Sequence, residues 1–269
     1  MQSILIGSGI LPEESVLLPT RILRTVFLGM HVLQGLGRVR PYHPKSGYIR
    51  KWCWGFFRHL NIRVEHLGCL PDPARGPYLV VSNHVSWLDP VGISSVHPVR
   101  FVSKSEIGQW PVLGPLSRRG GAVFLERGSP RSLKGVSQEM ETLLGQGESI
   151  GLFPEGTTTK GSGVLPFAPA LFEPACRTKA SVLPVAIKYT RKNGTELALS
   201  AAFVDNQSFL SSFKSILNEG DLRVTLSWTP PVRPDEMSRR NLAELSRNRI
   251  EAILKSEKSL DTEAPFLLP

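Results

Sequence analysis

The stretch VVSNHVSWLD, residues 80–89, decides the fold of this chain. It continues an apolar, β-branched run that is typical of a buried strand, and it turns polar at Ser82. A helical pattern follows over residues 86–96, so we expect a strand, a short polar turn and then a helix. That order of elements is the repeating unit of α/β folds.

The same alternation of short apolar runs and helical patterns continues from residue 62 onward. Strands are predicted at 62–67, 78–82, 99–104, 121–125, 149–153, 182–190, 196–204 and 222–228. Helices are predicted at 86–96, 131–145, 167–176, 207–218 and 237–256. The pattern predicts an α/β fold with a mixed, largely parallel sheet flanked by helices. A Lys-Asn-Gly turn at 192–194 predicts the hairpin that makes the sheet mixed.

The N-terminal segment differs in charge from the rest of the chain. Residues 15–64 hold nine Lys and Arg residues and no Asp or Glu, within a chain of net charge +9. Such a segment attracts an anionic partner, either a nucleic acid or an anionic membrane surface. Because no nucleic-acid-binding motif accompanies the charge, we favour the membrane surface and expect no nucleic-acid partner.

Two helices are predicted in this basic segment, at 20–37 and 47–61, before the sheet begins. In the second helix, apolar and aromatic residues fall on one face and basic residues on the other. Two interpretations remain open: a helix that lies in a membrane interface, or an amphipathic helix that packs on the body of the protein. We divide the chain into a basic amphipathic helix pair, 1–61, and a sheet domain, 62–269.

No segment of the sequence is predicted to cross a membrane. The uncharged stretch 25–37 has thirteen residues, which as a helix span about 20 Å of a ~30 Å hydrocarbon core. Glu13, Glu14 and the absence of a basic start argue against a signal peptide. Three widely spaced cysteines argue against a disulfide framework and a thiolate metal site. We therefore expect a peripheral, monotopic protein on the cytoplasmic face of the cell membrane.

Polar segments follow three of the predicted strands, at 82–89, 125–129 and 153–161. In open α/β sheets, ligands bind at the carboxyl ends of the strands, so we expect these segments to form a site. His84 and Asp89 have two interpretations at this point: a general base held by a carboxylate, or a loop histidine before a helix-start charge.

The sequence GESIG at 147–151 matches the G-x-S-x-G pattern of serine hydrolases. A hydrolase serine lies between a strand and a following helix, whereas a helical pattern precedes Ser149 and an apolar run follows it. Ser149 is therefore interpreted as the start of a strand. A base at His84 would then activate a hydroxyl group that the substrate brings.

Other residues at the strand ends also have both a functional and a structural interpretation. Glu155, Gly156 and Thr157 form a turn whose backbone N–H groups could bind an anion, or which simply ends a strand. Arg127 and Lys104 could bind a phosphate group, or could be ordinary surface cations.

Four ordered motifs, taken together, resemble those of the glycerolipid acyltransferase family, which includes 1-acylglycerol-3-phosphate and lysophospholipid acyltransferases. They are Asn83-His84 with Asp89, Gly121 to Arg127, Phe153 to Thr157, and Val182 to Ile187. The resemblance covers roughly residues 78–190, and the N-terminal helices resemble the membrane-docking hairpin of bacterial members. It marks 62–269 as an acyltransferase domain.

The resemblance implies an O-acyltransferase without metal or cofactor, with acyl-CoA or acyl-carrier protein as co-substrate. His84, oriented by Asp89, would act as general base on the free hydroxyl of a membrane lysolipid, with no acyl-enzyme. Arg127, Lys104 and the 155–157 turn would bind substrate. The expected reaction converts 1-acylglycerol-3-phosphate to phosphatidic acid.

One position departs from the family pattern. Many members have a basic residue directly after Glu-Gly-Thr, whereas Thr158 stands there in this chain. A lysophospholipid or a lyso-ornithine-type aminolipid is therefore an alternative acceptor. A lipid hydrolase that uses Ser149, and a non-catalytic membrane-binding or nucleic-acid-binding protein, are competing hypotheses.

Overall fold

Seven strands form one sheet in the computed structural model, in the order β1-β7-β6-β2-β5-β3-β4. The structure describes residues 18–38, 47–126, 128–191, 194, 196–204 and 207–256. All neighbouring strands are parallel except β6 and β7, which are antiparallel. The strands are β1 (Ile62–Gly68), β2 (Tyr78–Ser82), β3 (Arg100–Lys104), β4 (Val123–Leu125), β5 (Ile150–Leu152), β6 (Ser181–Arg191) and β7 (Leu222–Trp228). The predicted mixed, largely parallel sheet is confirmed.

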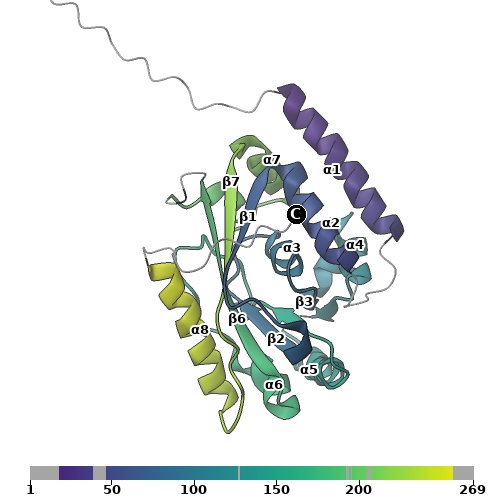
Figure 1. Cartoon of the computed structure of the whole chain (residues 1–269). Helices are drawn as coiled ribbons and strands as arrows, with labels where there is room; N and C mark the ends of the chain where they lie inside the picture. Colours follow the sequence, from purple (N-terminus) through teal and green to yellow (C-terminus); the bar gives the residue numbers. More distant parts are fainter. Residues whose placement is uncertain are drawn as a thin grey trace, which may run out of the picture.

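Helices cover both faces of the sheet (Figure 1). They are α1 (Leu18–Arg38), α2 (Gly47–Leu60), α3 (Asp89–Ser94), α4 (Leu113–Arg119), α5 (Pro130–Gly145), α6 (Glu173–Thr178), α7 (Phe209–Glu219) and α8 (Arg239–Lys255). Buried side chains of α1, α2, α3 and α7 share one apolar cluster with the sheet. Those of α5, α6 and α8 share a second cluster on the other face.

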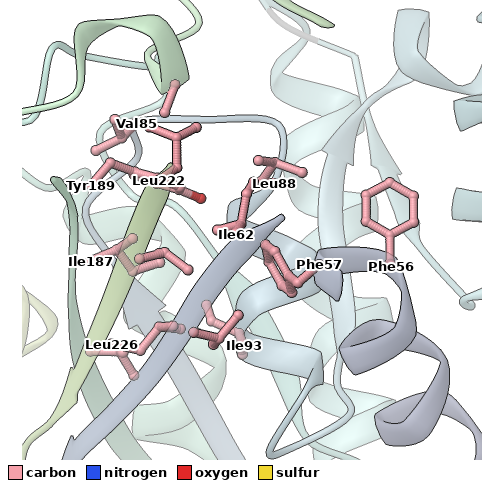
Figure 2. Close-up of a cluster of buried hydrophobic side chains, with 14 of the residues drawn as sticks. Phe56, Phe57, Ile62, Val85, Leu88, Ile93, Ile187, Tyr189, Leu222 and Leu226 are labelled. Atoms are coloured by element: carbon pink, nitrogen blue, oxygen red, sulfur yellow. The ribbon is translucent and has the colours of Figure 1, made fainter. Parts of the chain in front are cut away.

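The central strands β2 and β6 explain why the sheet needs helices on both sides. Every residue of β2 is buried, and β6 is buried continuously from Val182 to Ile187. A strand that is buried on both faces reads as an unbroken apolar run, which is how both segments appear in the sequence. Figure 2 shows part of the resulting core, where Ile187 and Leu226 of adjacent strands face Ile93 of α3.

The predicted strand at 196–204 is wrong. The segment makes one isolated bridge, Thr190 with Leu197, and then a 3-10 turn over Leu199–Ala201. Its alanines have a low strand propensity, and they are small enough to pack tightly in the core. The antiparallel partner of β6 is instead β7, while the predicted turn at 192–194 lies largely outside the described residues. The short helix α4 was not predicted.

Helices α1 and α2 pack through two glycines. The His31 ring of α1 lies over Gly55, and the Trp52 indole of α2 lies over Gly35. His31 Nε2 is 2.8 Å from the Trp52 carbonyl oxygen, and Trp52 Nε1 donates to the His31 carbonyl oxygen at 3.1 Å. The two rings are stacked with their centroids 5.2 Å apart. The His31 and Trp52 side chains thus each contact the backbone of the opposite helix.

The two helices differ in what their apolar faces contact. The apolar face of α2 is buried against the body at Cys53, Phe56, Phe57 and Leu60, so the interpretation of α2 as a packed amphipathic helix is correct. Helix α1 instead exposes six large apolar side chains at helical spacing, which we call the α1 outer face. They are Ile22, Leu23, Val26, Phe27, Met30 and Leu33. Among the described residues, no helix has both the length and the apolarity needed to cross a bilayer.

The core does not follow the division of the chain at residue 61. Leu28 of α1 and Phe57 of α2 belong to the same apolar cluster as Ile62 and Leu226 of the sheet (Figure 2). The helix pair and the sheet therefore share buried surface. The boundary between 1–61 and 62–269 stays a prediction.

Candidate active site

The site begins where β2 ends, at Ser82, in the middle of the sheet. Asn83 continues the hydrogen-bond ladder between β2 and β6, and it does so with its side-chain amide instead of its backbone. Its amide Nδ2 donates to the Ile187 carbonyl oxygen, and its Oδ1 accepts from the Ile187 N–H, both at 2.8 Å. These two bonds fix the start of the 83–88 turn to β6, so the residue after Asn83 has a defined position at the sheet edge.

That next residue is His84, and its imidazole is held by Asp89. His84 Nδ1 lies 2.8 Å from Asp89 Oδ2. A carboxylate only accepts hydrogen bonds, so Nδ1 carries the proton and Nε2 keeps its lone pair. The same Oδ2 accepts from the Val85 and Ser86 N–H groups at 2.8 and 2.9 Å, and Oδ1 accepts from the Tyr189 hydroxyl at 2.8 Å. Asp89 is 1% exposed, so its charge is balanced by these donors.

Asp89 is also the first residue of α3. A carboxylate at a helix start is stabilised by the free N–H groups of the first turn. The structural and the functional interpretations of Asp89 are therefore compatible, since the turn before the helix brings the carboxylate back to His84.

The second polar segment holds the ring and backbone of His84. The Phe153 ring stacks on the imidazole with centroids 3.9 Å apart and planes 11° apart. The His84 N–H donates to Glu155 Oε1 at 2.8 Å, and the His84 carbonyl oxygen accepts from the Thr159 N–H at 2.8 Å. The imidazole thus cannot tilt without breaking contacts to a neighbouring strand end.

Glu155 contacts the backbone on both sides of the site. One carboxylate oxygen accepts from His84 N–H, and the other accepts from Leu165 N–H at 2.9 Å. Burial raises the pKa of Glu155, while the two backbone N–H groups oppose that shift. Both oxygens already have partners in the protein, so Glu155 supports the loop of His84, and its binding of substrate stays a prediction.

The remaining predicted residues are only partly brought together. Gly156 has a φ of 70°, a conformation that favours glycine, and its N–H donates to the Phe153 carbonyl oxygen. Among the described residues, nothing accepts from the Thr157 N–H, which leaves it as the turn's candidate anion donor. Lys104 ends β3 and is exposed. Arg127 lies outside the described residues.

His84, Lys104, Gly156 and Thr157 all line one cavity of about 620 Å³. That volume is in the range of ~300–1,000 Å³ that is common for small-molecule sites. The rest of its wall is mostly apolar and comes from α2, β3, the 105–120 region and β5; examples are Trp52, Phe56, Phe101, Trp110 and Leu152. His84 therefore stands at the wall of a mostly apolar cavity, whose lining also includes two exposed cations, Lys104 and Arg119.

Ser149 lies away from this cavity. It precedes β5, and its hydroxyl oxygen accepts from the Tyr78 N–H at 3.0 Å. It also lies 3.0 Å from Nε2 of His97, yet neither residue lines the cavity. Both residues are buried at the amino ends of the strands. This position supports a structural role for Ser149 and gives the hydrolase hypothesis no substrate site.

Three contributors were not predicted: the side-chain ladder of Asn83, the ring of Phe153 and the hydroxyl of Tyr189. Phe153 directly precedes the Pro-Glu-Gly-Thr turn, so its adjacency to a motif was a usable signal. Tyr189 is 100 positions from Asp89 in the sequence, and no local pattern links them.

Comparisons with known proteins agree with this geometry. The family model Acyltransferase matches residues 61–188. The chain is 35% identical to lyso-ornithine lipid O-acyltransferase of Brucella abortus over 212 residues, which cover 74% of this chain and 77% of that protein. It is 39% identical to 1-acyl-sn-glycerol-3-phosphate acyltransferase of Neisseria meningitidis over 144 residues, 54% of this chain and 56% of the relative. That match therefore spans little more than half of the relative's length.

A solved structure has the same fold. The LPA acyltransferase PlsC from Thermotoga maritima superposes with a TM-score of 0.59 at 21% identity, covering 89% of this chain and 95% of that one. The likeness extends through the N-terminal helices as well as the sheet. From the length and identity of the Brucella match, the chain belongs to the acyltransferase family.

Proposed function

We propose that this protein transfers an acyl group from a thioester, acyl-CoA or acyl-carrier protein, to the free hydroxyl of a lysolipid. One observation carries the proposal: His84, held by Asp89 through Nδ1 and with no partner on Nε2 among the described residues, lines a mostly apolar cavity of about 620 Å³. An apolar cavity suits acyl chains, and a base whose ring is bonded to no serine, threonine or cysteine side chain of the described residues suits a hydroxyl on the substrate.

The reaction then follows from the hydrogen-bond pattern. Nε2 of His84 takes the proton of the lysolipid hydroxyl while that oxygen attacks the thioester carbonyl carbon. Asp89 stabilises the imidazolium that forms, and we assign the developing oxyanion to the Thr157 N–H, since Thr157 lines the same cavity as His84. The tetrahedral intermediate expels the thiolate, which takes the proton back from Nε2. The products are the diacyl lipid and a free thiol.

The test is acyl transfer by the purified protein, read as free thiol and as diacyl product by mass spectrometry. We expect His84→Ala to lower kcat by at least about a thousandfold while the variant still unfolds cooperatively. Full activity of His84→Ala would refute the mechanism. Free fatty acid released without an acceptor, and lost in Ser149→Ala, would instead support the hydrolase.

We infer that the acceptor is a lyso-ornithine-type aminolipid. Thr158 stands where a phosphate-binding cation would be expected, and its hydroxyl donates to the Phe203 carbonyl oxygen. Four relatives named lyso-ornithine lipid O-acyltransferase are matched over 61–77% of their own length, whereas four named 1-acyl-sn-glycerol-3-phosphate acyltransferase are matched over 45–56% of theirs. The length of these matches and the missing cation both support an acceptor other than a phosphomonoester.

1-Acylglycerol-3-phosphate is the second candidate acceptor. The Neisseria relatives are more identical, at 39–42%, and Lys104 and Arg119 both line the cavity. A competition assay with both lysolipids decides between the two acceptors. We expect a preference for the aminolipid that Thr158→Arg shifts toward the phosphate lipid; a wild-type preference for the phosphate lipid would refute the inference.

We also propose that the α1 outer face lies in the membrane interface on the cytoplasmic side. Six exposed apolar side chains at helical spacing, next to a basic segment, favour an interfacial helix on anionic lipid. Leu33, 67% exposed, is a suitable probe. Leu33→Glu should weaken binding to phosphatidylglycerol vesicles by about tenfold or more. Leu165→Glu, on a loop held by Arg247 of α8, is the control and should not weaken binding.

A further inference from the structure

The Asp89 carboxylate accepts from donors of two kinds. Three of them approach Oδ2 and come from its own turn: His84 Nδ1 and the N–H groups of Val85 and Ser86. The fourth is the Tyr189 hydroxyl, which donates to Oδ1 at 2.8 Å from a different element, β6. Oδ1 thus has one partner in the described structure, and that partner is distant in sequence.

Strand β6 holds the catalytic turn at two points. The backbone of Ile187 binds the side chain of Asn83, and Tyr189, two residues later, binds Asp89. The Ile187 contact is made by the backbone, in the plane of the sheet, whereas the Tyr189 contact is made by a side chain that lies on the same face of β6 as the Ile187 side chain. Figure 2 shows Tyr189 close to Val85 and Leu222 on this side of the sheet.

The Tyr189 hydroxyl is the donor in its bond to Asp89. It is 2% exposed, and burial and the neighbouring Asp89 carboxylate raise the pKa of its hydroxyl well above the usual value. The phenol therefore keeps its proton at neutral pH. Other titratable groups near the pair are His84 itself and Glu155, which binds the His84 N–H.

We propose that Tyr189 is a positioning residue for acyl transfer, which fixes the rotation of the Asp89 carboxylate and thereby the orientation and proton affinity of His84. The inference rests on the proposed role of His84 as general base. A carboxylate held at Oδ1 cannot rotate away from Nδ1. A donor on Oδ1 also withdraws charge from Oδ2, which makes the paired imidazole less basic.

The test is Tyr189→Phe, with Tyr78→Phe as the matched control. Tyr78 is 1% exposed on the adjacent strand β2, and its hydroxyl donates to the Asp72 carbonyl oxygen at 2.9 Å, away from the site. Each variant loses one bonded, buried-ring hydroxyl. We expect Tyr189→Phe to lower kcat by about tenfold, equivalent to one net hydrogen bond, with KM within about twofold because no substrate contact is removed. Tyr78→Phe should change neither constant.

The pH profile separates positioning from general loss of stability. Without the donor, the imidazole becomes more basic, so the acidic limb of kcat/KM should move to higher pH by about half a unit. Replacing tyrosine with 3-fluorotyrosine, a stronger donor, in the Tyr78→Phe background should move the same limb to lower pH. This second measurement needs no change at position 189 other than the fluorine.

The outcomes are distinguishable. Equal effects of Tyr189→Phe and Tyr78→Phe, or a fluorotyrosine protein whose limb does not move, would overturn the positioning role while His84→Ala remained inactive. An active His84→Ala would overturn the proposed function itself. A loss of kcat in Tyr189→Phe with the predicted opposite limb shifts would support the inference.

Discussion

Acidification is expected to destabilise this protein through two buried histidines. His66 accepts from Trp228 Nε1 at Nδ1 and is 2.9 Å from the Ser95 hydroxyl oxygen; His97 is bonded to Ser149. They are 4% and 8% exposed. Burial lowers the pKa of each to about 4, and for His97 the charge of Arg50 adds to the effect.

The direction and size of the change in unfolding free energy follow from the linkage between protonation and folding. Both histidines are neutral in the folded state down to about pH 4, whereas in the unfolded chain they gain a proton below about pH 6.5. The unfolding free energy therefore falls as the pH falls from about 6.5 to 4, by about 3 kcal/mol for each histidine. A typical domain has only about 5–15 kcal/mol to lose. Glu155 opposes this trend, because its raised pKa favours the folded state as it becomes protonated.

Urea unfolding followed by circular dichroism at pH 7.5, 6.0 and 5.0 measures the effect. We expect the unfolding free energy to fall steadily over this range in the wild type. His66→Gln and His97→Gln should each reduce the slope, whatever their stability at pH 7.5. An unfolding free energy that is constant from pH 7.5 to 5.0, or a slope that neither variant changes, would refute the reasoning.

Two further predictions concern the helix pair and the catalytic turn. Gly55→Ala would place a Cβ 2.6 Å from the His31 ring, so we expect amide hydrogen exchange in α1 to become at least about tenfold faster. Gly29→Ala is the control: its Cβ would have nothing within 4 Å, so it should slow the exchange. The opposite order of the two variants would contradict the packing of α1 on α2. Glu155→Gln leaves one carbonyl oxygen to accept from two backbone N–H groups, so kcat should fall by about ten- to a hundredfold in a thiol-release assay. A wild-type kcat in this variant would show that the turn does not need the Glu155 carboxylate.

The sequence predicted the sheet and the placement of the site because both have local signals. The apolar runs at 78–82 and 182–190 match β2 and β6 within one residue, and the polar turns that follow β2 and β5 meet at His84. Periodicity and turn residues are properties of neighbouring positions, so one sequence contains them.

What could not be predicted depends on contacts between distant segments. The segment 196–204 has an apolar pattern like that of a strand, yet its Phe203 N–H donates to the Val85 carbonyl oxygen, which holds the segment against the 83–88 turn. The difference in burial between the apolar faces of α1 and α2 likewise depends on which of the two helices packs on the sheet. Both helices have the amphipathic pattern, and only the packing decides which apolar face stays exposed.

The position of β1 at the edge of the sheet sets an order of events during synthesis. Ile62 is paired with Leu222, and every ladder partner of β1 belongs to β7. A ribosome that adds roughly 5–20 residues per second needs about ten to thirty seconds to deliver that partner. During this interval the aromatic face of α2 and the apolar residues of α1 have no sheet to cover them. The α1 outer face does not depend on β7, so the lipid attachment that we propose for it would come before the sheet is complete.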